Sequence, residues 1–189
     1  MDYEYVPWEK IHEICLIFAQ EIKKDGFKPD LIIAIARGGL AVGRIMADLL
    51  EVRDFKSIQV KSYENQKQKS RIKIESFKKE LFIKKKILIC EDIVDSGDSL
   101  TVILAKMKES VLMGGEIRTL AILKKQSSFT PNYFLQLEND NWIIYPWEIN
   151  ETYKELINHY SKDNSYTIML NAGAPENILN KIVKHNDNS

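Results

Sequence analysis

The chain alternates between short apolar runs and longer segments in which apolar residues recur at helical spacing. The apolar runs cover residues 30–36, 85–91 and 117–125. Each run is too short for a helix between its flanking breakers, and it is typical of a strand buried on both faces of a parallel sheet. The helical segments cover residues 7–24, 37–51 and 99–113. Their alternation with the strands predicts an α/β fold with a doubly wound parallel sheet.

Two further segments have the character of strands. Residues 57–63 alternate between polar and apolar positions, and residues 141–148 form a short aromatic segment that Pro146 interrupts. The segment that follows residue 63 has a different character from these strands. Residues 64–76 are polar, rich in lysine and without any period, so we expect a mobile loop there, with a partly paired segment as the alternative.

The pattern changes again at about residue 150. Two helices are predicted beyond that point, over residues 151–162 and 175–184, with linkers that contain asparagine and glycine between them. We therefore expect a main domain over residues 1–149 and a helical C-terminal extension over 150–189, to which the sequence assigns no role.

The composition excludes several classes of protein. The 189 residues include 27 Lys+Arg and 27 Asp+Glu, and this balance gives no net field that would attract nucleic acid or an anionic membrane. Cys15 and Cys90 stand in apolar segments without metal-type spacing, which indicates buried thiols in a reducing compartment. Neither an apolar signal segment nor a run of membrane-spanning length occurs. We expect a cytoplasmic protein that binds neither membranes nor nucleic acid.

The segment ILICEDIVDSGDSL carries the strongest chemical signal. Gly97 lets successive backbone N–H groups point into one concavity at a helix N-terminus, where Ser96 and Ser99 add hydroxyl donors, so a phosphate monoester fits there. Glu91 and Asp92 repel phosphate, but they can accept hydrogen bonds from vicinal hydroxyls or hold Mg²⁺. A capped helix with solvated acids is the ordinary explanation of a lone S-G-x-S. The acids, the glycine and the serines in this order indicate a ribose 5-phosphate site instead.

Two other turns follow apolar strands, with the sequences ARGGL and KKQSS. Ligands of parallel sheets bind at the carboxyl ends of the strands, so we expect all three turns to converge on one site.

ILICEDIVDSGDSL resembles the phosphoribosyl-pyrophosphate signature of the type I phosphoribosyltransferases. IAIARGGLAVG is similar to the pyrophosphate loop of that family, and NWIIYPWE is similar to a segment of its purine-using branch, typified by xanthine-guanine phosphoribosyltransferases. The resemblance covers roughly residues 8–150. It implies a sheet with a small base-side hood, and transfer of the 5-phosphoribosyl group of phosphoribosyl pyrophosphate to hypoxanthine, guanine or xanthine, as in purine salvage. The implied cofactor is Mg²⁺, and the implied assembly is a homodimer or homotetramer.

The resemblance also implies a role for each matching residue. Phosphoribosyl-pyrophosphate contacts would come from Arg37, Gly38, Glu91, Asp92, Asp95, Ser96, Gly97, Asp98, Ser99 and Arg71. Base contacts would come from Asp95, Lys124, Trp142, Ile143 and Glu148. Glu91 and Asp92 would hold the metal; Asp95, Arg37 and Lys124 would be catalytic, with Asp95 as the general base. Asp98 departs from the family pattern, which often has a neutral residue there, and we expect it to face solvent or cap the helix.

Two structural expectations accompany these roles. Segment 64–76 would be a flap that closes over the reacting groups, with Ser62 and Tyr63 at its hinge and with Arg71, or alternatively Lys69 or Lys67, reaching the pyrophosphate. Members of the family often have a non-proline cis peptide before the residue that matches Arg37.

Two other functions remain open on the sequence. The first is a non-catalytic regulator of the same fold that senses phosphoribosyl pyrophosphate or a purine. The short segment before the first helix and the neutral charge argue against it, since such regulators commonly carry a DNA-binding module there. The second is a pyrimidine or orotate phosphoribosyltransferase, against which NWIIYPWE and Lys124 argue. Adenine is disfavoured because a lysine donor suits an oxo group.

Overall fold

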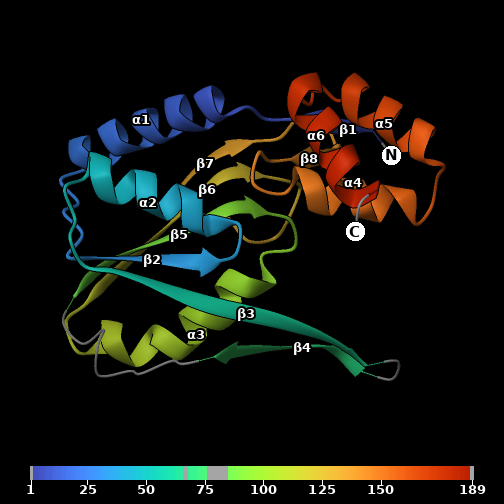
Figure 1. Cartoon of the computed structure of the whole chain (residues 1–189). Helices are drawn as coiled ribbons and strands as arrows, with labels where there is room; N and C mark the ends of the chain where they lie inside the picture. Colours follow the sequence, from blue (N-terminus) through green and yellow to red (C-terminus); the bar gives the residue numbers. More distant parts are fainter. Residues whose placement is uncertain (1, 66–67, 76–84, 188–189) are drawn as a thin grey trace. The chain divides into compact units, whose positions relative to one another are not determined.

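The computed structural model describes residues 2–65, 68–75 and 85–187 (Figure 1). The elements in chain order are β1 (Tyr3–Tyr5), α1 (Trp8–Lys24), β2 (Leu31–Ala36), α2 (Gly39–Leu49), β3 (Phe55–Asn65), β4 (Gln68–Glu75), β5 (Lys86–Val94), α3 (Asp98–Leu112), β6 (Glu116–Lys124), β7 (Tyr133–Gln136), β8 (Trp142–Ile144), α4 (Ile149–Ile157), α5 (Lys162–Asn171) and α6 (Glu176–Asp187). The chain forms two compact units, which we call the sheet unit (His12–Glu138) and the terminal unit (Met1–Ile11 with Asn139–Ser189). Each is described by itself.

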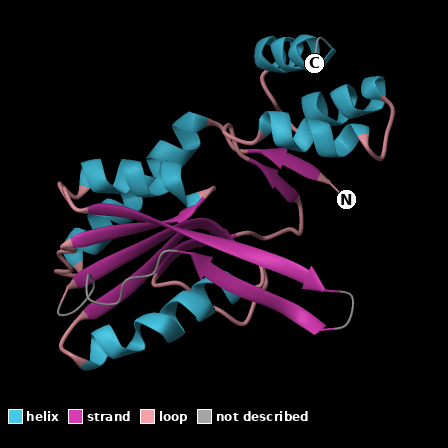
Figure 2. Ribbon diagram, turned by 60° about the horizontal axis from the view of Figure 1, so that its bottom comes forward, coloured by secondary structure: helices cyan, strands magenta, loops and turns pink. Residues whose placement is uncertain are grey.

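The sheet unit contains a six-stranded sheet in the order β4-β3-β2-β5-β6-β7. Every neighbouring pair is parallel except β3 and β4, which confirms the predicted α/β fold. Helices α1 and α2 lie on one face of the sheet and α3 lies on the other (Figure 2). The strands that were predicted from apolar runs are the central ones, because only strands covered on both faces are apolar at every position.

Alternation along β2 and β5 assigns each side chain to one face. Ile33 and Ile89 belong to a buried cluster with Leu100, Ile103 and Met107 of α3. On the other face, a Cβ added to Gly43 of α2 would lie 2.9 Å from the Cβ of Ala34. Because Gly43 has no side chain, α2 can pack closely on β2 and on Phe55 of β3.

In the described part of segment 64–76 the expected loop is wrong, and the alternative, a paired segment, is what the structure has. Residues 64–65 belong to β3 and residues 68–75 form β4, which pairs with β3 in antiparallel register, Tyr63 opposite Arg71. Ser62 and Tyr63, the expected hinge, therefore lie within a strand. Along one edge of β4, backbone groups pair with β3, and such cross-strand pairing leaves little trace in a polar sequence. Residues 66–67 and 76 lie outside the described residues.

The terminal unit contains a two-stranded parallel sheet, β1 with β8, and three helices. The pairing of β1 with β8 joins the first residues of the chain to its last third. The prediction of two helices after residue 150 missed α5, whose sequence KDNSYTIMLN has weak helical periodicity. Ser161 begins this helix by accepting a hydrogen bond from the Asn164 N–H at 3.3 Å. No helix in the described ranges has the length and apolar character needed to span a membrane.

Candidate functional site

The acid-rich turn connects β5 to α3 at the carboxyl edge of the sheet. Gly97 has a φ of +83°, a left-handed conformation that glycine adopts without a steric penalty. The turn is fixed from within, because the Asp98 N–H donates to Ser96 Oγ at 3.3 Å and Thr101 Oγ1 donates to the Gly97 carbonyl at 2.9 Å. Its residues line a hollow of about 120 Å³, formed by Glu91 and by residues 93–100. The turn therefore has an open concavity in front of a helix N-terminus, as an anion site requires.

Two buried acids precede this turn, and the first of them, Glu91, lines the hollow. Glu91 and Asp92 are each 9% exposed, and they lie inside β5, which continues to Val94 and so runs further than predicted. The Asp92 N–H donates to Glu91 Oε1 at 3.3 Å, and the Ile93 N–H donates to Asp92 Oδ1 at 2.9 Å. Burial, followed by the charge of neighbouring Asp92, raises the pKa of Glu91 well above its usual range. This paired negative charge is suited to a cation or to hydroxyl donors.

The turn after β2 packs directly on these acids. A Cβ added to Gly38 would lie 1.7 Å from Asp92 Oδ2, and one added to Gly39 would lie 2.5 Å from the carbonyl oxygen of Cys90. The Ala36–Arg37 peptide is cis, as the family resemblance led us to expect. Arg37 itself is exposed at the edge of the sheet. Residues 37–39 and residues 90–92 thus form one continuous surface.

The turn after β6 completes this edge. The Lys125 N–H donates to the Val94 carbonyl at 2.9 Å, which ties the ends of β5 and β6 together. Further along, a Cβ added to Gly97 would lie 2.2 Å from the Cβ of Phe129, so the aromatic residue rests on the glycine. The three turns that were predicted to converge therefore do so, because β2, β5 and β6 are adjacent and parallel. The contribution of Phe129 was not predicted.

Lys124 ends β6 beside this surface and is 7% exposed. Its Nζ lies 3.3 Å from the Lys125 carbonyl oxygen, 3.5 Å from Oε1 of Gln136 and 5.6 Å from the ring centre of Phe134. Gln136 lies opposite Lys124 in the β6–β7 register. Sequence reasoning singled out the lysine and missed the glutamine, since a single polar residue in β7 has no local signature.

Asp95, Ser96 and Asp98 are exposed at the turn, and Ser99 is half-buried. Asp98 is the first residue of α3, and its exposure agrees with the expectation that it faces solvent. Arg71 lies in β4, of which only the backbone is described here, and the same holds for Lys69. Lys67 lies outside the described residues.

The predicted base-contacting residues of segment 141–148 belong to the terminal unit. Trp142 is 38% exposed and Ile143 is buried. Glu148 Oε1 accepts a hydrogen bond from the Tyr145 N–H at 3.0 Å, which closes the turn before α4. Trp147 stacks on Tyr145 at a centroid distance of 4.8 Å, so it packs within this segment.

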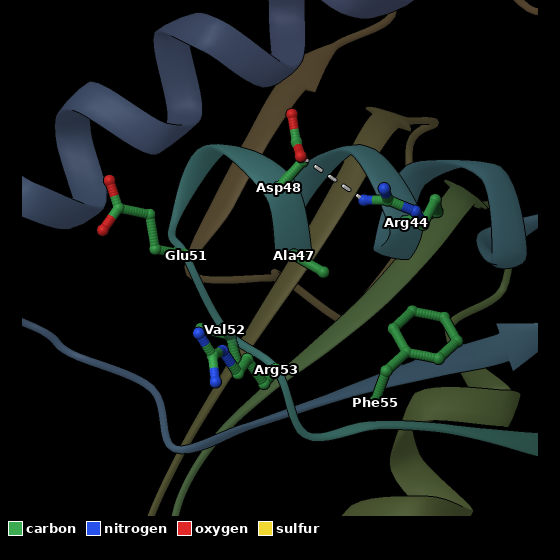
Figure 3. Close-up of a pocket in the computed structure, with 7 residues that line it drawn as sticks. All are labelled: Arg44, Ala47, Asp48, Glu51, Val52, Arg53 and Phe55. Atoms are coloured by element: carbon green, nitrogen blue, oxygen red, sulfur yellow. Dashed lines mark ion pairs between the residues drawn. The ribbon is translucent and has the colours of Figure 1, made fainter.

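A larger hollow of about 550 Å³ lies at the amino end of β3, where the segment after α2 enters this strand (Figure 3). Residues Arg44, Ala47, Asp48, Glu51, Val52, Arg53 and Phe55 line it. Arg44 and Asp48 pair with each other at 3.7 Å, and their side chains are 71% and 73% exposed. This open surface hollow is separate from the converging turns, because it lies at the amino end of β3.

These features together are typical of the type I phosphoribosyltransferase class of α/β protein. They are the glycines after β2, the acid pair and serine-glycine turn at the end of β5, and the lysine at the end of β6. The family model described as "Phosphoribosyl transferase domain" matches residues 4–153, and the chain belongs to this family. The resemblance read from the sequence is thereby confirmed, and with it the expectation that the chain is a transferase.

The individual relatives agree. The chain is 29% identical over 157 residues to xanthine-guanine phosphoribosyltransferase of Cereibacter sphaeroides, covering 80% of this chain and 90% of that protein. It is 28% identical over 160 residues to the protein of the same name from Vibrio atlanticus, covering 83% and 96%. Among solved structures, a purine phosphoribosyltransferase from Pyrococcus horikoshii matches with a TM-score of 0.66 and 27% identity, covering 78% of this chain and 95% of that one.

Proposed function

We propose that the protein transfers the 5-phosphoribosyl group of phosphoribosyl pyrophosphate to a 6-oxopurine, namely hypoxanthine, guanine or xanthine, in purine salvage. In this reaction the bond from C1 of the sugar to pyrophosphate breaks, and a bond from C1 to N9 of the base forms. The products are a nucleoside 5′-monophosphate and pyrophosphate. The observation that carries the proposal is the contact of the Gly38 backbone with the Asp92 carboxylate, beside the open turn of residues 95–99.

The proposal assigns the 5′-phosphate of the sugar to the turn of residues Ser96, Gly97, Asp98 and Ser99. Backbone N–H groups at the start of α3 and the hydroxyls of both serines are donors, and phosphate oxygens are acceptors. The vicinal ribose hydroxyls donate to Glu91, which lines the same hollow, and to Asp92, the next residue of β5. With the phosphate bound by the turn and the ribose hydroxyls bound by the acids, the sugar lies between the negatively charged phosphate and the carboxylates.

Mg²⁺ fits the residues present. Mg²⁺ commonly takes one or two carboxylates and completes its shell with water and substrate oxygens. Glu91 and Asp92 would hold it here, and across the described part of the chain no cluster of three metal-ligating side chains forms. When bound, the ion neutralises charge on the departing pyrophosphate.

Arg37 and Gly38 would bind the pyrophosphate, the first through its guanidinium and the second through its backbone. Arg71 of β4 is proposed to reach the same group from the β3–β4 hairpin. When the bond from C1 to pyrophosphate breaks, its electron pair stays with the pyrophosphate. The donors at Arg37 therefore act where negative charge increases during the reaction.

Asp95 would act as general base, taking the proton from the imidazole ring of the base while N9 attacks the sugar. Its exposed position at the turn next to the hollow leaves it accessible to a ligand. Lys124 would donate to the 6-oxo group, and Trp142, Ile143 and Glu148 are proposed to contact the rest of the base. Since Glu148 already accepts from the Tyr145 N–H, any contact with the base must share that carboxylate.

The predicted homodimer or homotetramer is tested by light scattering after size exclusion.

The test is a panel of radiolabelled bases with phosphoribosyl pyrophosphate and MgCl₂. Asp95→Asn should lose most turnover, on the order of a hundredfold for a general base, while it still binds phosphoribosyl pyrophosphate. Asp48→Asn, the same change at an exposed acid near the other edge of the sheet, is the control and should keep wild-type turnover. Full activity of Asp95→Asn would refute the assignment of the base, and no turnover with any base by the wild-type protein would refute the function.

A further inference from the structure

Gln136 makes contacts at both ends of its carboxamide with the residue proposed to bind the base. Its Nε2 donates to the carbonyl of Lys124 at 2.9 Å and to the carbonyl of Leu137 at 3.1 Å. Its Oε1 lies 3.5 Å from the Lys124 ammonium. One side chain of β7 thus holds both the backbone and the charged end of the residue opposite it in β6.

The ammonium of Lys124 is buried among neutral groups. Its contacts are the Lys125 carbonyl, the Gln136 carboxamide and the face of the Phe134 ring. Among the described residues no carboxylate forms an ion pair with it, although the residue is only 7% exposed. Because no carboxylate is paired with it, Lys124 can interact with an incoming oxygen without first breaking an ion pair.

The orientation of the ammonium needs an explanation, because a lysine side chain has four rotatable bonds and loses considerable freedom when it is fixed. The Lys125 carbonyl and the Gln136 oxygen accept from Nζ on two sides, and the Phe134 ring lies against it. These three groups, two of them from β7, restrict the ammonium at the end of β6. In the β5–β6 register Lys124 pairs with Val94, which immediately precedes Asp95, so the backbone of Lys124 lies beside the turn that carries the proposed base.

We infer that Gln136 is a positioning residue that holds Lys124 in place, with its charge uncompensated, for the 6-oxo group of the base. This inference rests on the proposed function. As Asp95 removes the proton from the base, negative charge spreads over the ring system onto the 6-oxo oxygen, and a fixed ammonium stabilises it there. A neutral partner serves this purpose because it orients the lysine without taking its charge.

The test is a double-mutant cycle with Gln136→Met, Lys124→Met and the double variant, measured with hypoxanthine as the base. Gln136→Met keeps the volume and removes both ends of the carboxamide. It should lower kcat/KM for the base by about tenfold, in line with lost hydrogen bonds to a charged group, and leave the KM for phosphoribosyl pyrophosphate unchanged. If the glutamine acts through the lysine, the double variant should be no worse than Lys124→Met alone.

Gln20→Met, the same change on the exposed surface of α1, is the matched control and should behave as wild type. Losses that multiply in the double variant would overturn the inference, since Gln136 would then act independently of Lys124. A Lys124→Met variant with an unchanged kcat/KM for the base would overturn the proposed role of Lys124 instead, so the two failures are distinguishable.

Gln136→Glu adds a negative charge beside Lys124, together with the loss of the two Nε2 hydrogen bonds, and covers the case in which Gln136→Met does not fold. The carboxylate keeps an acceptor for Lys124 but neutralises it, so kcat/KM for the base should again fall by about tenfold or more while the KM for phosphoribosyl pyrophosphate stays constant. Wild-type kcat/KM in a folded Gln136→Glu variant would show that a neutral partner is not required and would overturn the inference.

Discussion

The backbone of Gly38 lies directly against the carboxylate of Asp92, with room for a hydrogen but not for a methyl group. A Cβ at Gly38 would come within 1.7 Å of Oδ2 and 2.3 Å of Cγ. This contact joins the turn after β2 to the acids of β5, two segments that are more than fifty positions apart in the sequence. The geometry of the proposed diphosphate and metal site therefore depends on the absence of a side chain at this position.

Gly38→Ala should displace Asp92 and weaken binding of phosphoribosyl pyrophosphate. We expect its KM to rise by about tenfold, the size of one lost charge-assisted hydrogen bond, and more MgCl₂ to be needed for half-maximal activity. Steady-state kinetics over a range of both ligands measures this. Gly26→Ala is the control for ligand binding, because a Cβ there meets no heavy atom within 4 Å; its φ of +67° gives the variant a cost in stability but no new contact. An unchanged KM in Gly38→Ala would mean that Asp92 is not needed in its present position.

Gly97→Ala should destabilise the fold more than Gly114→Ala does. Both glycines have positive φ, +83° and +93°, so an alanine has a similar backbone cost of about 1 kcal/mol at either site. Only at Gly97 does the new methyl meet a neighbour, the Cβ of Phe129 at 2.2 Å. The two free energies of unfolding, measured in urea, should differ by about 1–3 kcal/mol, as for other overpacked sites. Equal losses would show that Phe129 moves aside without cost.

Stability should fall at alkaline pH because of the buried thiols. Burial raises the pKa of Cys15 from 9.0 to about 12, and it raises the pKa of Cys90 well above its usual range. Below pH 9 both states hold these protons and the thiols contribute no pH dependence. Between pH 9 and 12 the unfolded chain loses protons that the folded protein keeps, so the free energy of unfolding decreases by up to about 1.4 kcal/mol per pH unit for each thiol.

Urea unfolding of wild type and of Cys15→Ala at pH 8 and pH 10.5 tests this prediction. The cavity in the variant lowers its free energy of unfolding equally at both pH values, so it does not affect the difference between them. The variant has one titrating thiol fewer. Its stability should therefore decrease less between the two pH values than that of the wild type. Parallel decreases would contradict the raised pKa of Cys15.

The central part of the fold was predictable because burial on both faces leaves an unambiguous apolar run. Strands β2, β5 and β6 are of this kind, and their turns could be assigned to one edge from parallel topology alone. The peripheral elements were missed for the opposite reason. β1 has three residues, and β4 and β7 each pair with a single neighbour, so their sequences reflect exposure as much as strand structure.

The residue types of the site were predictable, but the contacts that orient them were not. Glu91, Asp92 and Gly97 are close in sequence, and their order is informative by itself. The contacts of Gly38 with Asp92 and of Gln136 with Lys124 depend on which strands are neighbours and on the register between them. No local pattern encodes either, since each pair is separated by strand-connecting segments of different length.

The position of Glu91 and Asp92 within β5 has a consequence for how the empty protein behaves. β5 pairs with β6 as far as Val94, and Ala121 lies opposite Glu91 in the register. Acids on such a rigid support cannot withdraw into solvent between one turnover and the next, as acids on a loop can. Burying two acids side by side is therefore a cost to folding, and in return an arriving ligand meets groups that need no further ordering.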